Sequence, residues 1–197
     1  MKNTLFIEAV KSIYPISKQI QKELDKRLKR KSGKAGDLIV KIGEVNDTLY
    51  FIESGMVRSY YFKEENENEE KIEVTSWIIN EFNFIYIPHS FISQTSSLEA
   101  VELLEDSEFI CLKHKDLYEL YNTFPEANYV GRILTEISLI MYDERVRFLR
   151  MMSAQKRHEI FQTSYPEIYE RAPLKYIASF LGLTPETLSR VRSKKSK

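Results

Sequence analysis

A short stretch near the C-terminus places a carboxylate and a guanidinium four positions apart, at Glu186 and Arg190, with Ser189 beside them. In a helix, residues i and i+4 share one face, so both groups would be presented together. A carboxylate can accept a hydrogen bond from N4 of cytosine, and a guanidinium can donate two to guanine. An ion pair on the helix surface is the alternative interpretation. The pair is therefore chemically suited to reading base edges, provided that a helix carries it.

The residues around this pair fit two short helices joined by a tight turn. The first helix would span 174–181, with Ala178 small enough for a close helix crossing, and Gly182 can adopt the left-handed conformation that ends it. Thr184 is a suitable N-cap, and Pro185 fits the first turn of a second helix. The inward side chains would be Ile177, Ala178, Leu181, Leu188 and Val191. This spacing is typical of a helix-turn-helix.

The charges of the chain are balanced overall but not locally. The 197 residues include 29 basic and 29 acidic side chains, which taken alone argues against a nucleic-acid partner. From Arg171 onward, however, the chain has a single acidic residue, Glu186, and seven basic ones. The basic residues are Arg171, Lys175, Arg190, Arg192, Lys194, Lys195 and Lys197. Local charge, rather than the total, sets the field that a phosphate backbone experiences. The C-terminal segment therefore remains suited to double-stranded DNA.

A long helix is expected further upstream, over residues 126–152, and a short helix from Ala154 to about Thr163 separates it from the helix-turn-helix. Its apolar residues recur at a spacing near 3.5, as in helices that pack against another helix. They are Val130, Ile133, Leu134, Ile137, Ile140, Met141 and Phe148. About 25 residues give a helix of about 38 Å, longer than a small β-domain can cover, so part of the face needs a second partner. We expect a homodimer along this helix, and a helix buried in its own core is the alternative.

Before this helix, the apolar period changes to that of β-strands. Two helices, at 5–13 and 17–28, precede short β-branched and aromatic runs that Gly, Asn and Asp interrupt between residues 38 and 113. The pattern predicts an α+β chain with an antiparallel barrel or sandwich in its middle. Cys111 lies in one of these runs and is expected to be a buried strand residue. The expected domains are 1–125, 126–152 and 153–197.

Several protein classes are excluded by what the sequence lacks. A single cysteine permits no intrachain disulfide and no four-cysteine zinc site. His89, His114 and His158 show no paired spacing, so no metal and no cofactor is expected. No Ser-His-Asp order or glycine-rich phosphate loop occurs, so an enzyme is not expected unless the fold assembles a hidden hydrolase cluster. No signal peptide or membrane-spanning stretch is evident, which predicts a cytoplasmic protein without a membrane partner.

Two longer motifs carry a specific resemblance. Residues 36–39 (GDLI), Gly43 and residues 49–58 (LYFIESGMVR) resemble the opening strands of a cyclic-nucleotide-binding-type barrel. Residues 176–190 (YIASFLGLTPETLSR) follow the long helix as the helix-turn-helix. In this order, they make the chain from Ile16 onward similar to the Crp/Fnr family of bacterial transcription regulators. The resemblance implies a jelly-roll sensor barrel, a dimerisation helix, a DNA-binding domain, and RNA polymerase as a partner.

The resemblance also implies roles within the helix-turn-helix. The family's recognition helix carries a Glu and, four positions on, an Arg that reach base edges, and these match Glu186 and Arg190. Ser189 matches a Ser of the oxygen-sensing branch. The candidate DNA-backbone contacts are Lys175, Thr184, Thr187, Arg192, Lys194 and Lys195, with a solubilising tail as the alternative for the basic ones. Pro185 replaces a further base-reading Arg of one branch, so the half-site need not match that branch. The chain stops before the usual β-hairpin wing, so a wingless domain is expected.

The sensor turn departs further from the family pattern. Members that bind a cyclic nucleotide hold its phosphate with Gly-Glu followed by Arg-Ser or Arg-Thr, because a buried anion needs N–H donors and a guanidinium. The matching stretch, 91–104, has no Gly-Glu and no Arg, and Glu99 and Glu102 add negative charge. The candidate effector pocket consists of Ser93, Gln94, Thr95, Ser96 and Ser97, and a polar turn without a ligand is the alternative. A cyclic nucleotide is therefore unexpected, and the effector is unidentified.

The expected function is sequence-specific DNA binding by a homodimeric transcription regulator. The alternative is a small-molecule-sensing adaptor whose C-terminal helices bind protein instead of DNA. Binding to genomic DNA fragments would separate the two.

Overall fold

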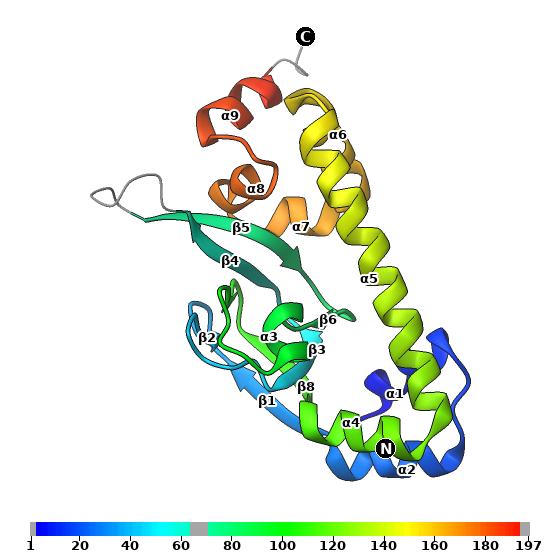
Figure 1. Cartoon of the computed structure of the whole chain (residues 1–197). Helices are drawn as coiled ribbons and strands as arrows, with labels where there is room; N and C mark the ends of the chain where they lie inside the picture. Colours follow the sequence, from blue (N-terminus) through cyan, green and yellow to red (C-terminus); the bar gives the residue numbers. More distant parts are fainter. Residues whose placement is uncertain (1–2, 64–70, 194–197) are drawn as a thin grey trace. The chain divides into compact units, whose positions relative to one another are not determined.

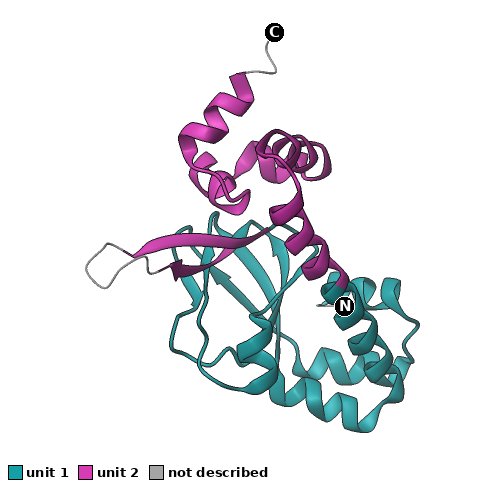
Figure 2. Ribbon diagram, turned by 45° about the horizontal axis from the view of Figure 1, so that its top comes forward, with its two compact units in different colours: residues 1–57, 79–139 teal, residues 58–78, 140–197 magenta. Residues whose placement is uncertain are grey.

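The computed structural model describes residues 3–63 and 71–193, and the chain divides into two compact units (Figures 1 and 2). Unit 1 consists of residues 1–57 and 79–139, and unit 2 consists of residues 58–78 and 140–197. Each unit therefore combines segments that are far apart in the sequence. Helices and antiparallel strands both contribute, so the chain is of the α+β class, as predicted.

Unit 1 contains the N-terminal helices and most of the strands. One of its sheets has the order β1-β8-β3-β6 and is antiparallel throughout, with Tyr50 of β3 opposite Cys111 of β8. A second antiparallel pairing joins β2 to β7. The elements are α1 (Thr4–Ile13), α2 (Lys18–Arg27), β1 (Lys29–Gly33), β2 (Leu38–Val40), β3 (Thr48–Ser54), β6 (Phe84–Ile85), α3 (Pro88–Ser93), β7 (Ala100–Leu103), β8 (Ser107–Lys113), α4 (His114–Thr123) and the first half of α5 (Pro125–Met151).

Strands β3 and β8 form the centre of unit 1 because both of their faces are buried. Phe51 and Ile110 belong to one apolar cluster, which they share with α1, α2, α4 and the start of α5. Ile52 and Phe109 belong to a second cluster on the opposite face. Successive residues of a strand point to opposite faces, which explains why these two strands are nearly continuous apolar runs.

Cys111 lies in the second of these clusters and is a buried, free thiol. Its removal from water raises the pKa of the thiol to about 11, because burial penalises the thiolate. The prediction of a small buried strand residue at this position is therefore confirmed.

The expected barrel is not closed in the part of the chain that the structure describes. The sheet β1-β8-β3-β6 ends at β1 on one side and at β6, a strand of two residues, on the other. A closed barrel needs a continuous ring of paired strands, and these ends leave the ring open. The observed architecture is therefore a pair of antiparallel sheets with helices.

Unit 2 combines a pair of neighbouring strands with the C-terminal helices. The strands are β4 (Val57–Lys63) and β5 (Ile72–Ile79), called here the β4–β5 pair. They are accompanied by the second half of α5, α6 (Ala154–Ser164), α7 (Pro166–Arg171), α8 (Leu174–Phe180) and α9 (Pro185–Ser193). The buried side chains of the helical part include Phe161, Ile168, Ile177, Leu181 and Leu188. Among the described helices, none has the length and apolar character that crossing a membrane requires.

Candidate nucleic-acid interface

Helices α8 and α9 meet at a tight turn of the kind that the sequence predicts. Gly182 has φ +64°, a backbone conformation that L side chains rarely adopt. The N–H of Leu183 donates to the carbonyl of Ala178 at 2.9 Å, which closes the end of α8. Ala178 is completely buried, as a close helix crossing requires.

The first turn of α9 is capped by Thr184. Its Oγ1 accepts a hydrogen bond from the N–H of Thr187 at 3.2 Å, and the N–H of Leu188 donates to its carbonyl at 3.0 Å. The Thr184 and Thr187 hydroxyls are also 3.2 Å apart. Both threonines, which are predicted contacts of the DNA backbone, therefore take part in the cap that starts α9.

The remaining side chains of α9 separate into two faces. Leu188 and Val191 are buried, whereas Glu186, Ser189 and Arg190 are exposed, which presents the expected reading residues to the outside. The pKa of Glu186 lies below its usual value because the carboxylate accepts a hydrogen bond from its own backbone N–H, with smaller contributions from Thr184 and the charge of Arg190.

Glu186 and Arg190 are not joined in an ion pair. Within the described part of the chain, the ion pairs with an N–O separation of 4.0 Å or less do not include these two side chains. Since the guanidinium and the carboxylate are not occupied by each other, both can reach a ligand. At this separation, the charge of Arg190 still contributes to the lowered pKa of Glu186.

Besides Arg190, two basic side chains in the described part of the helix-turn-helix are exposed. Lys175 is exposed at the start of α8, with its Nζ 4.6 Å from the centroid of the Tyr176 ring. Arg192 is exposed near the end of α9, with its guanidinium carbon 5.8 Å from the centroid of the Tyr169 ring. The other two predicted backbone contacts, Lys194 and Lys195, lie outside the described residues.

Arg145, whose role is not predicted from the sequence, connects α5 to α8. Its Nη2 donates a hydrogen bond to the carbonyl of Phe180, and its guanidinium carbon lies 3.7 Å from the centroid of the Phe180 ring. Burial lowers the pKa of Arg145 to about 10, so the side chain stays charged at neutral pH. A cation at the C-terminal end of α8 also complements the helix dipole. In the sequence, Arg145 lies between Met141 and Phe148 in an otherwise apolar stripe, and a charged residue in such a stripe could have indicated a structural role.

The predicted dimerisation stripe of α5 is divided between two environments. Val130 is buried in the first core cluster and Leu134 packs against that cluster, so these two face the helix's own unit. Ile137, Ile140 and Met141 are 45%, 58% and 42% exposed. The remaining two, Ile133 and Phe148, are half-buried.

Several polar side chains of the candidate effector pocket bond within their own turn, and Gln94 also donates to the carbonyl of Asn46 at 3.4 Å. Ser93 Oγ donates to the carbonyl of His89 at 2.6 Å and lies 2.6 Å from Thr95 Oγ1. Gln94 donates to the carbonyl of Phe91 at 2.7 Å. Ser97 is buried, and its Oγ donates to the carbonyl of Glu99 at 2.6 Å. Ser96 forms an isolated bridge with Val45. These contacts hold the turn together and connect it to residues 43–46.

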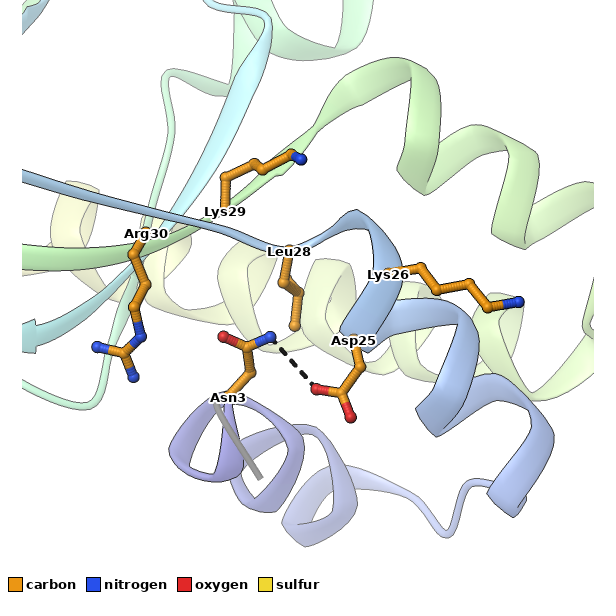
Figure 3. A pocket seen from close by; sticks show the side chains of 6 residues that line it. All are labelled: Asn3, Asp25, Lys26, Leu28, Lys29 and Arg30. Carbon is orange, nitrogen blue, oxygen red and sulfur yellow. Dashed lines mark hydrogen bonds between the residues drawn. The ribbon is translucent and has the colours of Figure 1, made fainter.

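A polar depression of about 560 Å³ lies elsewhere in unit 1, near the ends of α1 and α2 (Figure 3). Asn3 donates to Asp25 across it at 3.2 Å. Two of the cations that line it have carboxylate partners, because Lys26 pairs with Glu23 and Arg30 pairs with Glu53. The depression does not overlap Ser93–Ser97, and the described residues contain no cluster of metal ligands.

No family model matches the sequence, and no curated protein matches it significantly. The fold, in contrast, matches known structures over most of the chain. FixK2 from Bradyrhizobium japonicum has 20% identity and a TM-score of 0.67 over 85% of this chain and 83% of its own. The c-di-GMP-responsive global regulator CLP from Xanthomonas campestris has 14% identity and a TM-score of 0.67 over 91% and 92%. A protein from Eubacterium rectale assigned to the Crp/Fnr family of transcriptional regulators has 19% identity and a TM-score of 0.65 over 92% and 84%.

The chain has the Crp/Fnr fold. The similarity covers both the strand-rich part and the C-terminal helices, since the match to CLP spans nine-tenths of each chain. The resemblance of the sequence motifs to the Crp/Fnr family is therefore matched by the Crp/Fnr fold itself.

Proposed function

We propose that this protein is a sequence-specific DNA-binding transcription regulator in which α9 is the recognition helix. The observation that carries the proposal is the exposed face of Glu186, Ser189 and Arg190 on a capped helix that α8 supports. Two of the proteins that share the fold are a global regulator and a transcriptional regulator, which supports this function. A protein-binding adaptor has no comparable observation in its favour.

In the proposed complex, α9 enters the major groove. Arg190 donates two hydrogen bonds to the O6 and N7 of a guanine, and the ionised Glu186 accepts one from a cytosine N4. Lys175 and Arg192 approach phosphates from either side, where they supply affinity without sequence preference. Because the net charge of the whole chain is zero, this local cluster provides the electrostatic attraction.

We propose a homodimer along α5, with two recognition helices set for half-sites about one turn of DNA apart. The exposed Ile137, Ile140 and Met141 support this assembly, because exposed apolar side chains along a helix gain stability by packing against a second copy. The proposed regulator would act on RNA polymerase as its further partner. Its effector is unidentified, and a cyclic nucleotide is not expected to bind, because the turn at residues 91–104 contains no arginine.

The test compares Arg190→Ala with Lys175→Ala on DNA sites selected from a random pool. Arg190→Ala should cost roughly 1–3 kcal/mol of specific binding and relax the preference at one base pair. Lys175→Ala should lower the affinity for all DNA sequences alike and reduce the salt dependence of binding, since it removes a phosphate contact. Selected sites for Arg190→Ala that are as sharp as those of the wild type would contradict the base-reading role. A wild-type protein that selects no site would contradict the proposed function.

A further inference from the structure

Ser179 of α8 occupies part of the outer edge of β5. This strand lies at the edge of its sheet, where backbone N–H and C=O groups lack a neighbouring strand. Ser179 Oγ accepts a hydrogen bond from the N–H of Thr75 at 2.9 Å and donates one to the carbonyl of Glu73 at 3.4 Å. Thr75 is buried, where an unpaired N–H would be unfavourable. One serine hydroxyl therefore joins the first helix of the helix-turn-helix to this strand.

Tyr176, which precedes Ser179 by three residues on α8, makes a second contact with the β4–β5 pair. The guanidinium carbon of Arg58 lies 3.7 Å from the centroid of the Tyr176 ring and 4.2 Å from that of Tyr60. Arg58 is 2% exposed and forms an ion pair with Glu73. A cation–aromatic contact strengthens as water is excluded. The guanidinium is therefore held between a ring of β4 and a ring of α8.

Phe180 completes this contact at the end of α8. Its ring centroid lies 6.3 Å from that of Trp77 on β5, and Trp77 in turn meets Tyr142 of α5 edge-on at 5.3 Å. We call the contacts of Tyr176, Ser179 and Phe180 with the β4–β5 pair the α8 seam. The seam leaves the reading side chains of α9 exposed. It therefore holds the helix-turn-helix without blocking its reading face.

We propose that Ser179 and Tyr176 are positioning residues for DNA recognition, through which the β4–β5 pair sets the orientation of α8 and, with it, of α9. Ala178 of α8 and Leu188 and Val191 of α9 are buried, and the two helices pack against each other, so a change in the orientation of α8 should carry α9 with it. The β4–β5 pair thereby supports α8 in one orientation, and we call this support the brace. This inference rests on the proposed function.

A brace affects specific binding more than non-specific binding. Hydrogen bonds to base edges require a fixed helix orientation, because they depend on distance and angle. Attraction to phosphates is long-ranged and tolerates reorientation. Loosening the seam should therefore lower the ratio of specific to non-specific affinity. Simple loss of folded protein would lower both affinities equally and leave the ratio unchanged.

The experiment measures the affinity of the full chain for its selected site and for unrelated DNA by fluorescence anisotropy. Ser179→Ala removes the hydrogen bonds to Thr75 and Glu73, of which the bond at 3.4 Å is the weaker. It should lower the specific affinity by about three- to tenfold and leave the non-specific affinity unchanged. Thr163→Ala is the matched control, because it removes a hydroxyl that bonds only to the carbonyl of Glu159 within α6. Tyr176→Leu should act as Ser179→Ala does, and Tyr176→Phe, which keeps the ring, should not.

A second readout needs no DNA. Trp77 is the single tryptophan of the chain and lies in the seam, so its quenching by acrylamide reports on the seam directly. Quenching should increase in Ser179→Ala and stay unchanged in Thr163→Ala. If the wild type discriminates between DNA sites and Ser179→Ala discriminates equally well, the positioning role is wrong and the proposed function stands. If the wild type binds no site, the proposed function is wrong, and unchanged quenching in Ser179→Ala would overturn the seam as well.

Discussion

Individual residues of the helix-turn-helix act through two different properties, backbone conformation and side-chain chemistry. Gly182 is required for its positive φ, and Ala178 for its small volume at the helix crossing. Glu186 and Arg190 contribute the donors and acceptors that the proposed readout uses. Substitutions at Gly182 and Ala178 should therefore change the stability of the protein, and substitutions at Glu186 and Arg190 should change its affinity for DNA.

Gly182→Ala should destabilise the protein by about 1–2 kcal/mol, because a β-carbon is disfavoured at φ +64°. The new β-carbon would also lie 3.2 Å from Cδ2 of Leu149. Gly182→Asn is the matched control, since it adds the same β-carbon but tolerates the left-handed region better. Urea unfolding of the three proteins measures the difference. An Ala variant as stable as the wild type, or less affected than the Asn variant, would contradict this role of Gly182.

Among the elements, α5 is the one whose two halves have different surroundings. Its first half contributes Val130 to a core, whereas exposed apolar side chains continue beyond it. A helix of 27 residues extends about 40 Å, which exceeds what one small core can cover. The division along the helix explains why only part of the apolar stripe is available to a second copy.

Ile137→Glu should convert the proposed dimer to a monomer, because it would bury a charge against an apolar partner surface. Ile137 is 45% exposed within one chain, so the fold itself should tolerate the change. Thr135→Glu, at an exposed position two residues away on α5, introduces the same charge as a control. Sedimentation velocity should give a monomer for the first variant and a dimer for the second. An unchanged dimer with Ile137→Glu would contradict dimerisation through this face.

At the scale of the whole molecule, arginine residues are distributed unevenly along the chain. No arginine occurs between Arg58 and Arg132, a span that includes the complete candidate effector turn. Arg58 itself is paired with Glu73 in unit 2. The hydroxyls of Ser93 and Ser97 bond within the turn. A buried phosphodiester would find no guanidinium in this turn, which is unfavourable in a low-dielectric site.

Cyclic AMP and cyclic GMP should therefore neither bind measurably nor change the affinity for DNA. A single charge-assisted hydrogen bond is worth about 1.5–3 kcal/mol, so its absence removes one to two orders of magnitude in affinity. Isothermal titration calorimetry at up to millimolar nucleotide checks the first statement, and DNA binding with and without nucleotide checks the second. Micromolar binding that sharpens DNA affinity would show that backbone N–H groups alone hold the phosphate.

The features that the sequence determined by itself are local ones. The turn at Gly182 and the cap at Thr184 use interactions that span no more than five residues, so their residue types and spacing identify them. The long helix was predicted at 126–152 and lies at Pro125–Met151, because its period repeats over many turns. The burial of Cys111 followed from the apolar run around it.

The tertiary structure alone decided which surfaces face one another. A periodic stripe marks an apolar face but not its partner, and only the packing of the N-terminal helices shows that Val130 and Leu134 face their own core. Whether paired strands close into a barrel likewise depends on their ends, which local sequence does not encode. The bond from Thr75 to Ser179 joins residues 104 positions apart, and each is an ordinary polar residue in its own segment. Such contacts arise when the chain brings distant segments together, so no local pattern could have revealed the α8 seam.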